Sequence, residues 1–318
     1  MVNVVLTLLM LVVGFVLLTK GADFFVDGAG GLATRLGVPS IVIGLTIVSL
    51  GTSAPEAAVT ITSAAQGIDQ MAIAGVFGSN IVNTLVVLGV VALVREAPMH
   101  KSTLRIEIPF VVGITGLLLI LCVRDGELGR LDACALLLLL VAYLGYLAYM
   151  MRSGTYTVDE SEDEDSLDAG QPMHRLILYT VVGAVAICLG AQLTVNSATD
   201  IALAVGLSDR VIGLTIVAVG TSLPELVTSV AAARKGQTDL AIGNIVGSSI
   251  FNVLFVLGIA GVIMPMPFDS SLLFDGLVSL AAIALLWVVC APQKKLGRLG
   301  GVSLLVCYIV YVVVVLMG

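Results

Sequence analysis

The sequence predicts an all-α membrane protein with ten transmembrane helices, arranged as two inverted five-helix repeats with broken helices at the membrane midplane. Three observations lead to this prediction. The 318 residues are 58% hydrophobic and only 12% charged, with a mean hydropathy of +1.11, which is too apolar for a soluble protein surface. Apolar stretches of about 20 residues, enough to cross a bilayer, alternate with short polar breaks. The chain also aligns with itself at one fixed offset.

Ten apolar stretches are long enough to span a membrane. They lie near residues 2–28, 39–66, 71–94, 105–123, 131–151, 174–198, 209–233, 239–263, 271–291 and 299–317. The first stretch has no preceding basic residue and no small-residue cleavage site. We therefore expect it to be the first membrane helix rather than a cleaved signal peptide.

Basic residues indicate how the spans are oriented, because cytoplasmic loops carry an excess of Lys and Arg. Ten spans place both termini on one side. With the termini outside, three basic residues face out: Arg124, Arg130 and Arg210. Eleven face the cytoplasm: Arg35, Arg95, Lys101, Arg105, Arg152, Arg175, Arg234, Lys235, Lys294, Lys295 and Arg298. The prediction is a multi-pass protein of the cell membrane, plasma or inner, with both termini outside.

The internal repeat has an offset of 169 residues. Residues 44–56 match residues 213–225 at ten of thirteen positions, and residues 73–89 match residues 242–258 at nine of seventeen. Because each half holds five spans, the second half must enter the membrane from the opposite side. Inverted repeats are typical of secondary transporters, whose binding site lies at the repeat interface near the midplane.

The repeat divides the chain into three parts. We predict a first repeat at residues 1–152, an acidic cytoplasmic loop at residues 153–172 and a second repeat at residues 173–318. The loop explains the net charge of −7: seven of the 22 acids lie within residues 159–168, and the other 22 − 7 = 15 equal the 15 bases. Such a run is typical of a solvated linker, and its spacing does not match an EF-hand.

Composition also excludes other classes of protein. No basic patch is present that could neutralise nucleic-acid phosphates. The five cysteines stand singly in or beside apolar runs, without the CxxC spacing of a metal or redox site. They are therefore expected to be small buried hydrophobic residues rather than disulfide partners.

Two glutamates, Glu56 and Glu225, occupy equivalent positions near the midpoints of the second and seventh spans. No Lys or Arg lies at that depth, and a buried carboxylate without a counter-charge costs several kcal/mol. Packing does not require a charge at either position. A cation from outside the protein is the natural counter-ion.

The residues around the glutamates are also repeated. Pro55 and Pro224 should break their helices, because proline lacks an N–H and clashes with the carbonyl four residues back. On helical spacing, two hydroxyls share the face of each glutamate, and two Ser–Asn pairs stand in the third and eighth spans. These residues are Thr52, Ser53, Thr221 and Ser222, with Ser79–Asn83 and Ser248–Asn252. An all-oxygen donor set suits Ca²⁺ or Na⁺ rather than Zn²⁺ or Cu²⁺.

At these positions the sequence resembles the sodium/calcium exchanger family of the cation/calcium antiporter superfamily, in its prokaryotic form. The family pattern G-T-S-x-P-E followed by G-S-[NS]-I-x-N stands at residues 51–56 with 78–83, and at 220–225 with 247–252. The resemblance implies a non-enzymatic antiporter that exchanges Na⁺ for Ca²⁺ by alternating access, with the first and sixth spans sliding across the rest. It needs no cofactor and no partner beyond the ions and the bilayer, and is expected to act as a monomer.

The resemblance also implies a ligand set. Glu56 and Glu225 would be the central shared ligands, and the carbonyls of Ser49 and Ala218 would complete the outer sites. Side-chain oxygens would come from Thr52, Ser53, Ser79, Thr221, Ser222 and Ser248. Some relatives, including potassium-dependent ones, have Asp where this chain has Asn252. With two formal negative charges, one Ca²⁺ would be neutralised, and three Na⁺ would leave one positive charge.

Three other functions fit the sequence less well. A proton/calcium antiporter of the same superfamily usually has G-N-x-x-E in place of G-T-S-x-P-E. A serine hydrolase using Ser53 or Ser222 would lack a base, because the two histidines, His100 and His174, lie at predicted span ends. A channel usually gathers symmetric rings of carboxylates from several subunits.

A smaller group of charges lies on one face of the first span. Lys20, Asp23 and Asp27 are spaced i, i+3 and i+7. This pattern allows either an ion-entry path or a local charge pair near the interface. Gln192 and Asn196 replace the two acids in the second half, which weakens a direct ligand role.

Deleting the acidic loop, residues 153–172, should spare transport, because a solvated linker supplies no ion ligand. The measurement is Ca²⁺ uptake by reconstituted protein under a Na⁺ gradient. Loss of uptake in a folded deletion variant would assign the loop a role in transport.

Overall fold

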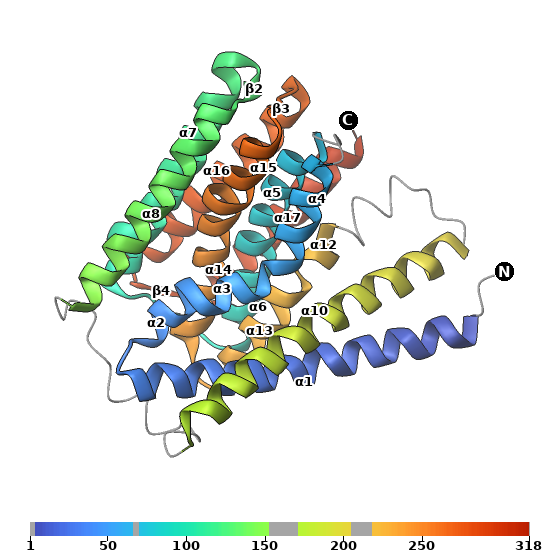
Figure 1. Cartoon of the computed structure of the whole chain (residues 1–318), viewed down its shortest axis with the longest axis vertical. Helices are drawn as coiled ribbons and strands as arrows, with labels where there is room; N and C mark the ends of the chain where they lie inside the picture. The colour runs from blue at the N-terminus through green and yellow to red at the C-terminus, as the bar shows by residue number, and fades with distance from the viewer. Residues whose placement is uncertain (1–3, 66–69, 153–170, 205–217, 318) are drawn as a thin grey trace.

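The computed structural model describes residues 4–65, 70–152, 171–204 and 218–317, and almost all of them are helical (Figure 1). In the first half the elements are α1 (Val4–Leu36), α2 (Ser40–Ile43), η1 (Gly44–Val48), α3 (Ser49–Thr52), α4 (Ala54–Ala65), α5 (Gln70–Val82), η2 (Asn83–Val87), α6 (Leu88–Val94), β1 (Ala97–Pro98), η3 (Thr103–Glu107), α7 (Ile108–Asp125), β2 (Glu127–Leu128) and α8 (Arg130–Arg152). In the second half they are α10 (Met173–Ala204), α12 (Ala218–Thr221), α13 (Leu223–Arg234), α14 (Thr238–Phe251), η5 (Asn252–Val256), α15 (Leu257–Ile263), β3 (Met266–Pro267), α16 (Ser270–Cys290), β4 (Lys295–Leu296) and α17 (Arg298–Met317). The η elements are single π-helical turns.

Nine of the ten predicted spans are present among the described residues. Eight single segments are long and apolar enough to cross a membrane: Leu6–Leu36, Ala72–Val94, Thr103–Asp125, Arg130–Arg152, Met173–Ala204, Thr238–Ile263, Leu272–Cys290 and Arg298–Met317. A ninth is the pair Ser40–Thr52 and Ala54–Thr62, which is bent by 48°. The span predicted near residues 209–233 begins at positions outside the described residues. The total of ten therefore stays a prediction.

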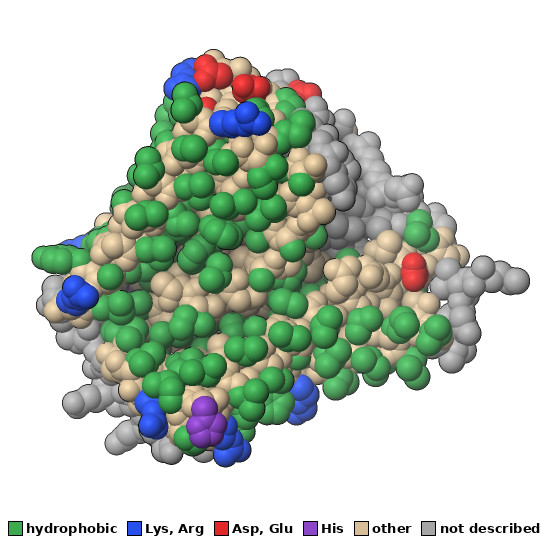
Figure 2. Space-filling model, in the orientation of Figure 1, with side chains coloured by type: hydrophobic (Ala, Val, Ile, Leu, Met, Phe, Trp, Pro, Cys, Tyr) green, Lys and Arg blue, Asp and Glu red, His purple; other side chains and the backbone are tan. Residues whose placement is uncertain are grey.

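The surface fits a chain that crosses a membrane several times. Figure 2 shows hydrophobic side chains over most of one face, with the charged side chains at its margins. Large apolar residues on the spans are strongly exposed, including Leu138 at 70% and Val288 at 66%. Exposure of this kind on so many helices is expected where lipid rather than water is the solvent.

The helix breaks fall where the prolines predicted them. In the first half α3 ends at Thr52, Ser53 interrupts the helix, and α4 begins one residue before Pro55. The carbonyl of Gly51, which the N–H of a non-proline residue 55 would bind, faces Cys188 Sγ at 4.0 Å. In the second half α12 ends at Thr221 and α13 begins one residue before Pro224. Both predicted breaks are confirmed.

Helices α1 and α10 pack along each other and run in opposite directions (Figure 1). Their contact is built on glycines. A Cβ atom added at Gly28 of α1 would lie 2.5 Å from the backbone nitrogen of Thr180, and one at Gly183 of α10 would lie 2.5 Å from the backbone nitrogen of Phe25. Gly14, Gly21 and Gly190 are equally close to the partner helix, with nearest contacts of 2.5–2.9 Å. The absence of side chains at these positions lets the two backbones touch.

Two short antiparallel ladders join the halves at opposite ends of the helices. At one end β1 pairs with β4, with Ala97 opposite Leu296. At the other end β2 pairs with β3, with Leu128 opposite Met266. Met266 is the repeat equivalent of Ala97, since 97 + 169 = 266. The two ladders are therefore related by the internal repeat and lie at opposite ends of the helices; we call these ends the β1–β4 end and the β2–β3 end.

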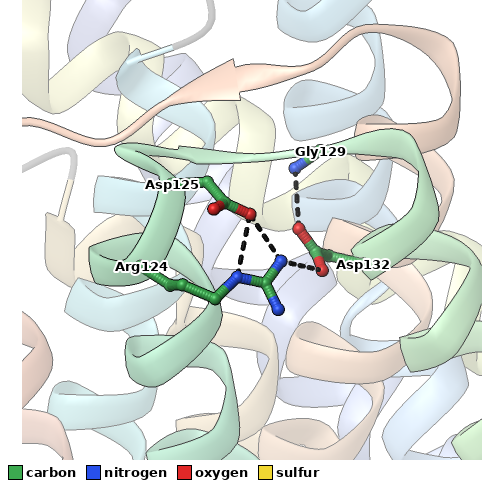
Figure 3. Close-up of polar contacts among 4 residues, drawn as sticks. All are labelled: Arg124, Asp125, Gly129 and Asp132. Carbon is green, nitrogen blue, oxygen red and sulfur yellow. Dashed lines mark hydrogen bonds and ion pairs between the residues drawn. The ribbon is translucent and has the colours of Figure 1, made fainter.

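Ion pairs stabilise the loops at both ends. At the β2–β3 end Arg124 donates to Asp125 and, over 3.3 Å, to Asp132 in the first turn of α8 (Figure 3). Asp132 also accepts a hydrogen bond from the backbone nitrogen of Gly129 at 3.3 Å. At the β1–β4 end the Lys295 ammonium lies 2.8 Å from Glu96 and holds the pKa of that carboxyl below its usual range.

Replacing Gly183 by Ala should destabilise the α1–α10 contact, because the new methyl group cannot fit without moving one backbone. Overpacking of this kind lowers the free energy of unfolding by about 1–3 kcal/mol. The measurement is the midpoint of thermal unfolding in detergent, which should fall. Gly145→Ala on α8 is the control, since its Cβ would meet no described atom within 4 Å. Equal midpoints for the two variants would contradict close packing.

Candidate cation-binding site

The polar residues predicted for the site gather at the two helix breaks. Ten of the twelve are at most 4% exposed, and all of these except Ser49, whose predicted contribution is its carbonyl, carry the predicted side-chain oxygens. We call these nine residues the central cluster: Thr52, Ser53, Glu56, Ser79, Asn83, Ser222, Glu225, Ser248 and Asn252. They come from the breaks beside α3 and α12 and from the middle of the continuous spans α5–η2 and α14–η5.

Each glutamate of the central cluster is held by a side chain from the other half of the chain. Ser53 Oγ donates to Glu225 Oε1 over 2.9 Å, and Asn252 Nδ2 donates to Glu56 Oε2 over 3.0 Å. The two carboxylates also interact electrostatically with each other. The repeats therefore do not form separate sites but share one.

Ser79 connects the remaining members from the two halves. Its hydroxyl lies 3.3 Å from Ser222 Oγ and 3.5 Å from the amide nitrogens of Asn83 and Asn252. Thr52 and Ser248 lie beside the Glu225 carboxylate. Thr52 Oγ1 also donates to Asn244 Oδ1 over 3.0 Å.

Both asparagines of the cluster stand at the first residue of a π-helical turn. Asn83 begins η2 and Asn252 begins η5, and the two positions are repeat equivalents, since 83 + 169 = 252. A π turn adds one residue and rotates the side chains that follow, and such turns are common at functional sites. The repeat predicted the paired asparagines, but not the π-helical backbone.

Several oxygen atoms of the cluster are buried and accept no hydrogen bond from any described residue. They are Glu56 Oε1, Glu225 Oε2, Asn83 Oδ1, Asn252 Oδ1 and Ser248 Oγ. A buried acceptor without a donor costs free energy, and so does a buried pair of carboxylates without a counter-charge. A cation bound among them would satisfy these oxygens at once. Carboxylate, amide and hydroxyl oxygens are the ligands that hard cations such as Ca²⁺ prefer.

The other three predicted ligands are not members of the central cluster. The Ser49 carbonyl already accepts hydrogen bonds from the Ser53 nitrogen at 3.0 Å and from Thr52 Oγ1 at 3.3 Å. Thr221, at the end of α12, is half-buried. Ala218 begins α12, and its surroundings lie partly outside the described residues.

The structure adds residues that the sequence analysis did not single out. Asn80 accepts a hydrogen bond from Asn252 at 3.3 Å, and Asn244 links Thr52 to Ser229 Oγ, the latter at 3.0 Å. Both asparagines are fully buried. An amide side chain in an apolar span could have indicated both residues in the sequence. Neither has an asparagine as its repeat equivalent, so comparing the two halves does not reveal them. Glu107 is a third fully buried carboxylate and accepts a hydrogen bond from Tyr146 at 3.4 Å, away from the cluster.

Glycines set how closely the helices around the cluster approach. A Cβ atom added at Gly247 would lie 2.7 Å from Ser49 Oγ and 2.8 Å from the Leu45 Cα, so α14 approaches η1 and α3 closely there. The equivalent Gly78 meets no described atom within 4 Å. Residue 214, the repeat equivalent of Leu45, lies outside the described residues.

The charges on the first span pair with a residue that the sequence analysis did not connect to them. Lys235, just after α13, lies 2.5 Å from Asp27 Oδ1 and 3.1 Å from the Asp23 carbonyl. Of the two alternatives left open by the sequence, the charge pair is present, but as an ion pair between α1 and the second half rather than a local pair within the first span. At the equivalent place on α10, Gln192 donates to Asn196 over 2.9 Å.

Comparison with known proteins agrees with this architecture. The family model described as "Sodium/calcium exchanger protein" matches residues 6–149 and 175–317. The chain is 37% identical to a putative antiporter, CaxA, from Alkalimonas amylolytica over 307 residues, covering 94% of this chain and 95% of the relative. It is 32% identical to the sodium/calcium exchanger MaX1 of Methanosarcina acetivorans, covering 96% and 97%. The archaeal sodium-calcium exchanger NCX_Mj, solved after soaking with Na⁺ and Sr²⁺, superposes with a TM-score of 0.83 at 28% identity and 98% coverage of both chains.

Adding Ca²⁺ should raise the midpoint of thermal unfolding of the purified protein, because a ligand that binds only the folded state stabilises it. Mg²⁺ should raise it less, since it gives up its water reluctantly and demands octahedral geometry. The Glu225→Gln variant should lose most of the Ca²⁺ effect. Glu107→Gln is the matched control, a buried carboxylate outside the cluster, and should keep it. If both variants lose the Ca²⁺-dependent rise in the midpoint equally, the ion does not bind at the central cluster.

Proposed function

The chain belongs to the sodium/calcium exchanger family, a family of cation/Ca²⁺ antiporters, and we propose that it exchanges Na⁺ for Ca²⁺ across a cell membrane. The single observation that carries this proposal is the shared pair of glutamates, each hydrogen-bonded by the opposite half of the chain. A site built from both halves can open to either side of the membrane when the halves rearrange. The twelve predicted residues are proposed as its ligands and their immediate supports.

The two glutamates are proposed as ligands common to both ions. Their unpartnered oxygens and the free amide oxygens of Asn83 and Asn252 offer a negative, all-oxygen environment. One Ca²⁺ balances two carboxylates, and monovalent Na⁺ ions that replace it need several sites among the same oxygens. Competition for shared carboxylates explains why the two ions would alternate rather than bind together.

Alternating access is proposed to involve the α1–α10 pair moving as one body. The glycine contacts tie these two helices closely to each other. Phe25 of α1 packs against Gly51, and Val195 of α10 packs against Gly220, so the pair touches both helix breaks. Movement of α1 and α10 would therefore change the contacts that Phe25 and Val195 make at the two helix breaks, and with them the access of ions to the cluster. The ten-span count, the inverted orientation of the halves and both termini outside belong to the same proposal.

Glu56→Gln or Glu225→Gln should abolish Ca²⁺ uptake into vesicles driven by an outward Na⁺ gradient, because each removes one of the two charges that hold Ca²⁺. The measurement is radiolabelled Ca²⁺ uptake by reconstituted protein. Glu107→Gln serves as the control and should transport normally. Uptake that persists in both cluster variants would show that the glutamates are not ligands of the transported ions.

Replacing the Na⁺ gradient by a pH gradient in the same assay identifies the coupling ion. We expect uptake with Na⁺ and none with the pH gradient alone. Uptake driven by the pH gradient would make the protein a proton/Ca²⁺ antiporter. Uptake without either gradient, at a rate set by the Ca²⁺ gradient only, would indicate a channel.

A further inference from the structure

A basic cavity lies at the β1–β4 end of the molecule, away from the central cluster. Its volume is about 370 Å³, and it is lined by Lys101, Leu104, Arg105, Trp287, Ala291 and Lys294. The first three belong to the segment that leads into α7 and the last three to the end of α16 and the loop after it. The cavity thus gathers three cations from the two halves of the chain.

The backbone around the cavity is built to hold these cations together. The β1–β4 ladder joins the two loops, and the Met99 nitrogen donates to the Lys294 carbonyl over 2.8 Å. Lys294 is the one non-glycine residue with positive φ in the described chain, at 52°. A left-handed lysine is uncommon and costs conformational energy, so the surrounding contacts must hold it in place.

The three cations have no anionic partner among the described residues. Lys101, Arg105 and Lys294 are exposed, and none makes an ion pair there. The neighbouring Lys295 differs, because it pairs with Glu96 at 2.8 Å. Three like charges around one cavity repel each other unless an anion lies between them.

The cavity borders the apolar surface of the helices. Trp287 is 41% exposed, and the adjacent Val288 is 66% exposed. On the α7 side Ile106, next to Arg105, is 38% exposed. Tryptophan is enriched where lipid headgroups meet acyl chains, so this position marks the membrane interface. The cavity therefore combines cations with an apolar rim.

We propose that this cavity binds the headgroup of an anionic phospholipid, with its acyl chains lying along the apolar surface beside Trp287. The three cations would surround the phosphate, with the Arg105 guanidinium supplying paired donors. Basic pockets between membrane helices are recognised sites for acidic lipid headgroups. A soluble anion or the chain's own acidic loop would match the charge but not the exposed apolar rim.

The only tryptophan in the chain, Trp287, reports directly on this site. The protein is reconstituted into phosphatidylcholine vesicles in which either phosphatidylglycerol or phosphatidylcholine carries brominated acyl chains, which quench tryptophan on contact. At equal mole fraction, brominated phosphatidylglycerol should quench more. The relative affinity should fall about fivefold for each cation removed at low ionic strength, so the triple variant K101Q/R105Q/K294Q should be quenched equally by both lipids.

A matched triple variant, R95Q/R152Q/R234Q, removes three exposed cations that do not line the cavity, and should keep the preference for phosphatidylglycerol. The single variant K294Q, at an exposed position, tests the proposal if the triple variant does not fold. Equal quenching by both lipids in the unaltered protein, or a preference that survives in K294Q and in the triple variant, would overturn the proposal.

Two further measurements separate the rival occupants. Inorganic phosphate at millimolar concentration should not reduce quenching by brominated phosphatidylglycerol; full competition would show that a soluble anion fills the cavity. Deleting residues 153–172 should leave quenching unchanged. A preference that arises only after this deletion would show that the acidic loop occupies the cavity, and would also overturn the lipid assignment.

Discussion

The constraint on which the rest of this structure depends is the burial of two carboxylates at the centre of a chain that crosses a membrane. Glu56 is 4% exposed and Glu225 is fully buried. Neither forms an ion pair with a Lys or Arg among the described residues. In such surroundings a carboxylate must be hydrogen-bonded and balanced by another charge. The hydrogen bonds come from the opposite repeat, and the proposed counter-charge is a transported cation.

Four departures from regular helix surround the two carboxylates. Ser53 and Ser222 interrupt their helices ahead of a proline, and Asn83 and Asn252 begin π-helical turns. Each departure would be costly in contact with lipid, because freed backbone groups have no water to bind. Buried together, they surround one polar cluster. Outside it, glycines allow direct backbone contact, as between α1 and α10.

The two halves share a plan but differ in detail, most clearly at the two ends of the helices. Lys235 pairs with Asp27 on α1, whereas α10 has the neutral pair Gln192 and Asn196. The β1–β4 end collects unpaired cations, whereas at the β2–β3 end Arg124 is neutralised by Asp125 and Asp132. The repeat is therefore nearly symmetric at the central cluster and asymmetric at its ends.

The sequence by itself determined the membrane class, the places of nine spans, the repeat and the two helix breaks, because hydrophobicity, proline chemistry and self-similarity can be read along the chain. It also determined nine of the residues that line the buried cluster, since each was matched by an equivalent in the other half. Only the tertiary structure decided which side chains meet. The cross-links from Ser53 to Glu225 and from Asn252 to Glu56 join residues 172 and 196 positions apart. The tertiary structure alone shows the partners of Asn80, Asn244 and Lys235. Contacts between helices depend on how the helices are rotated and packed, and residue spacing along the chain does not give this.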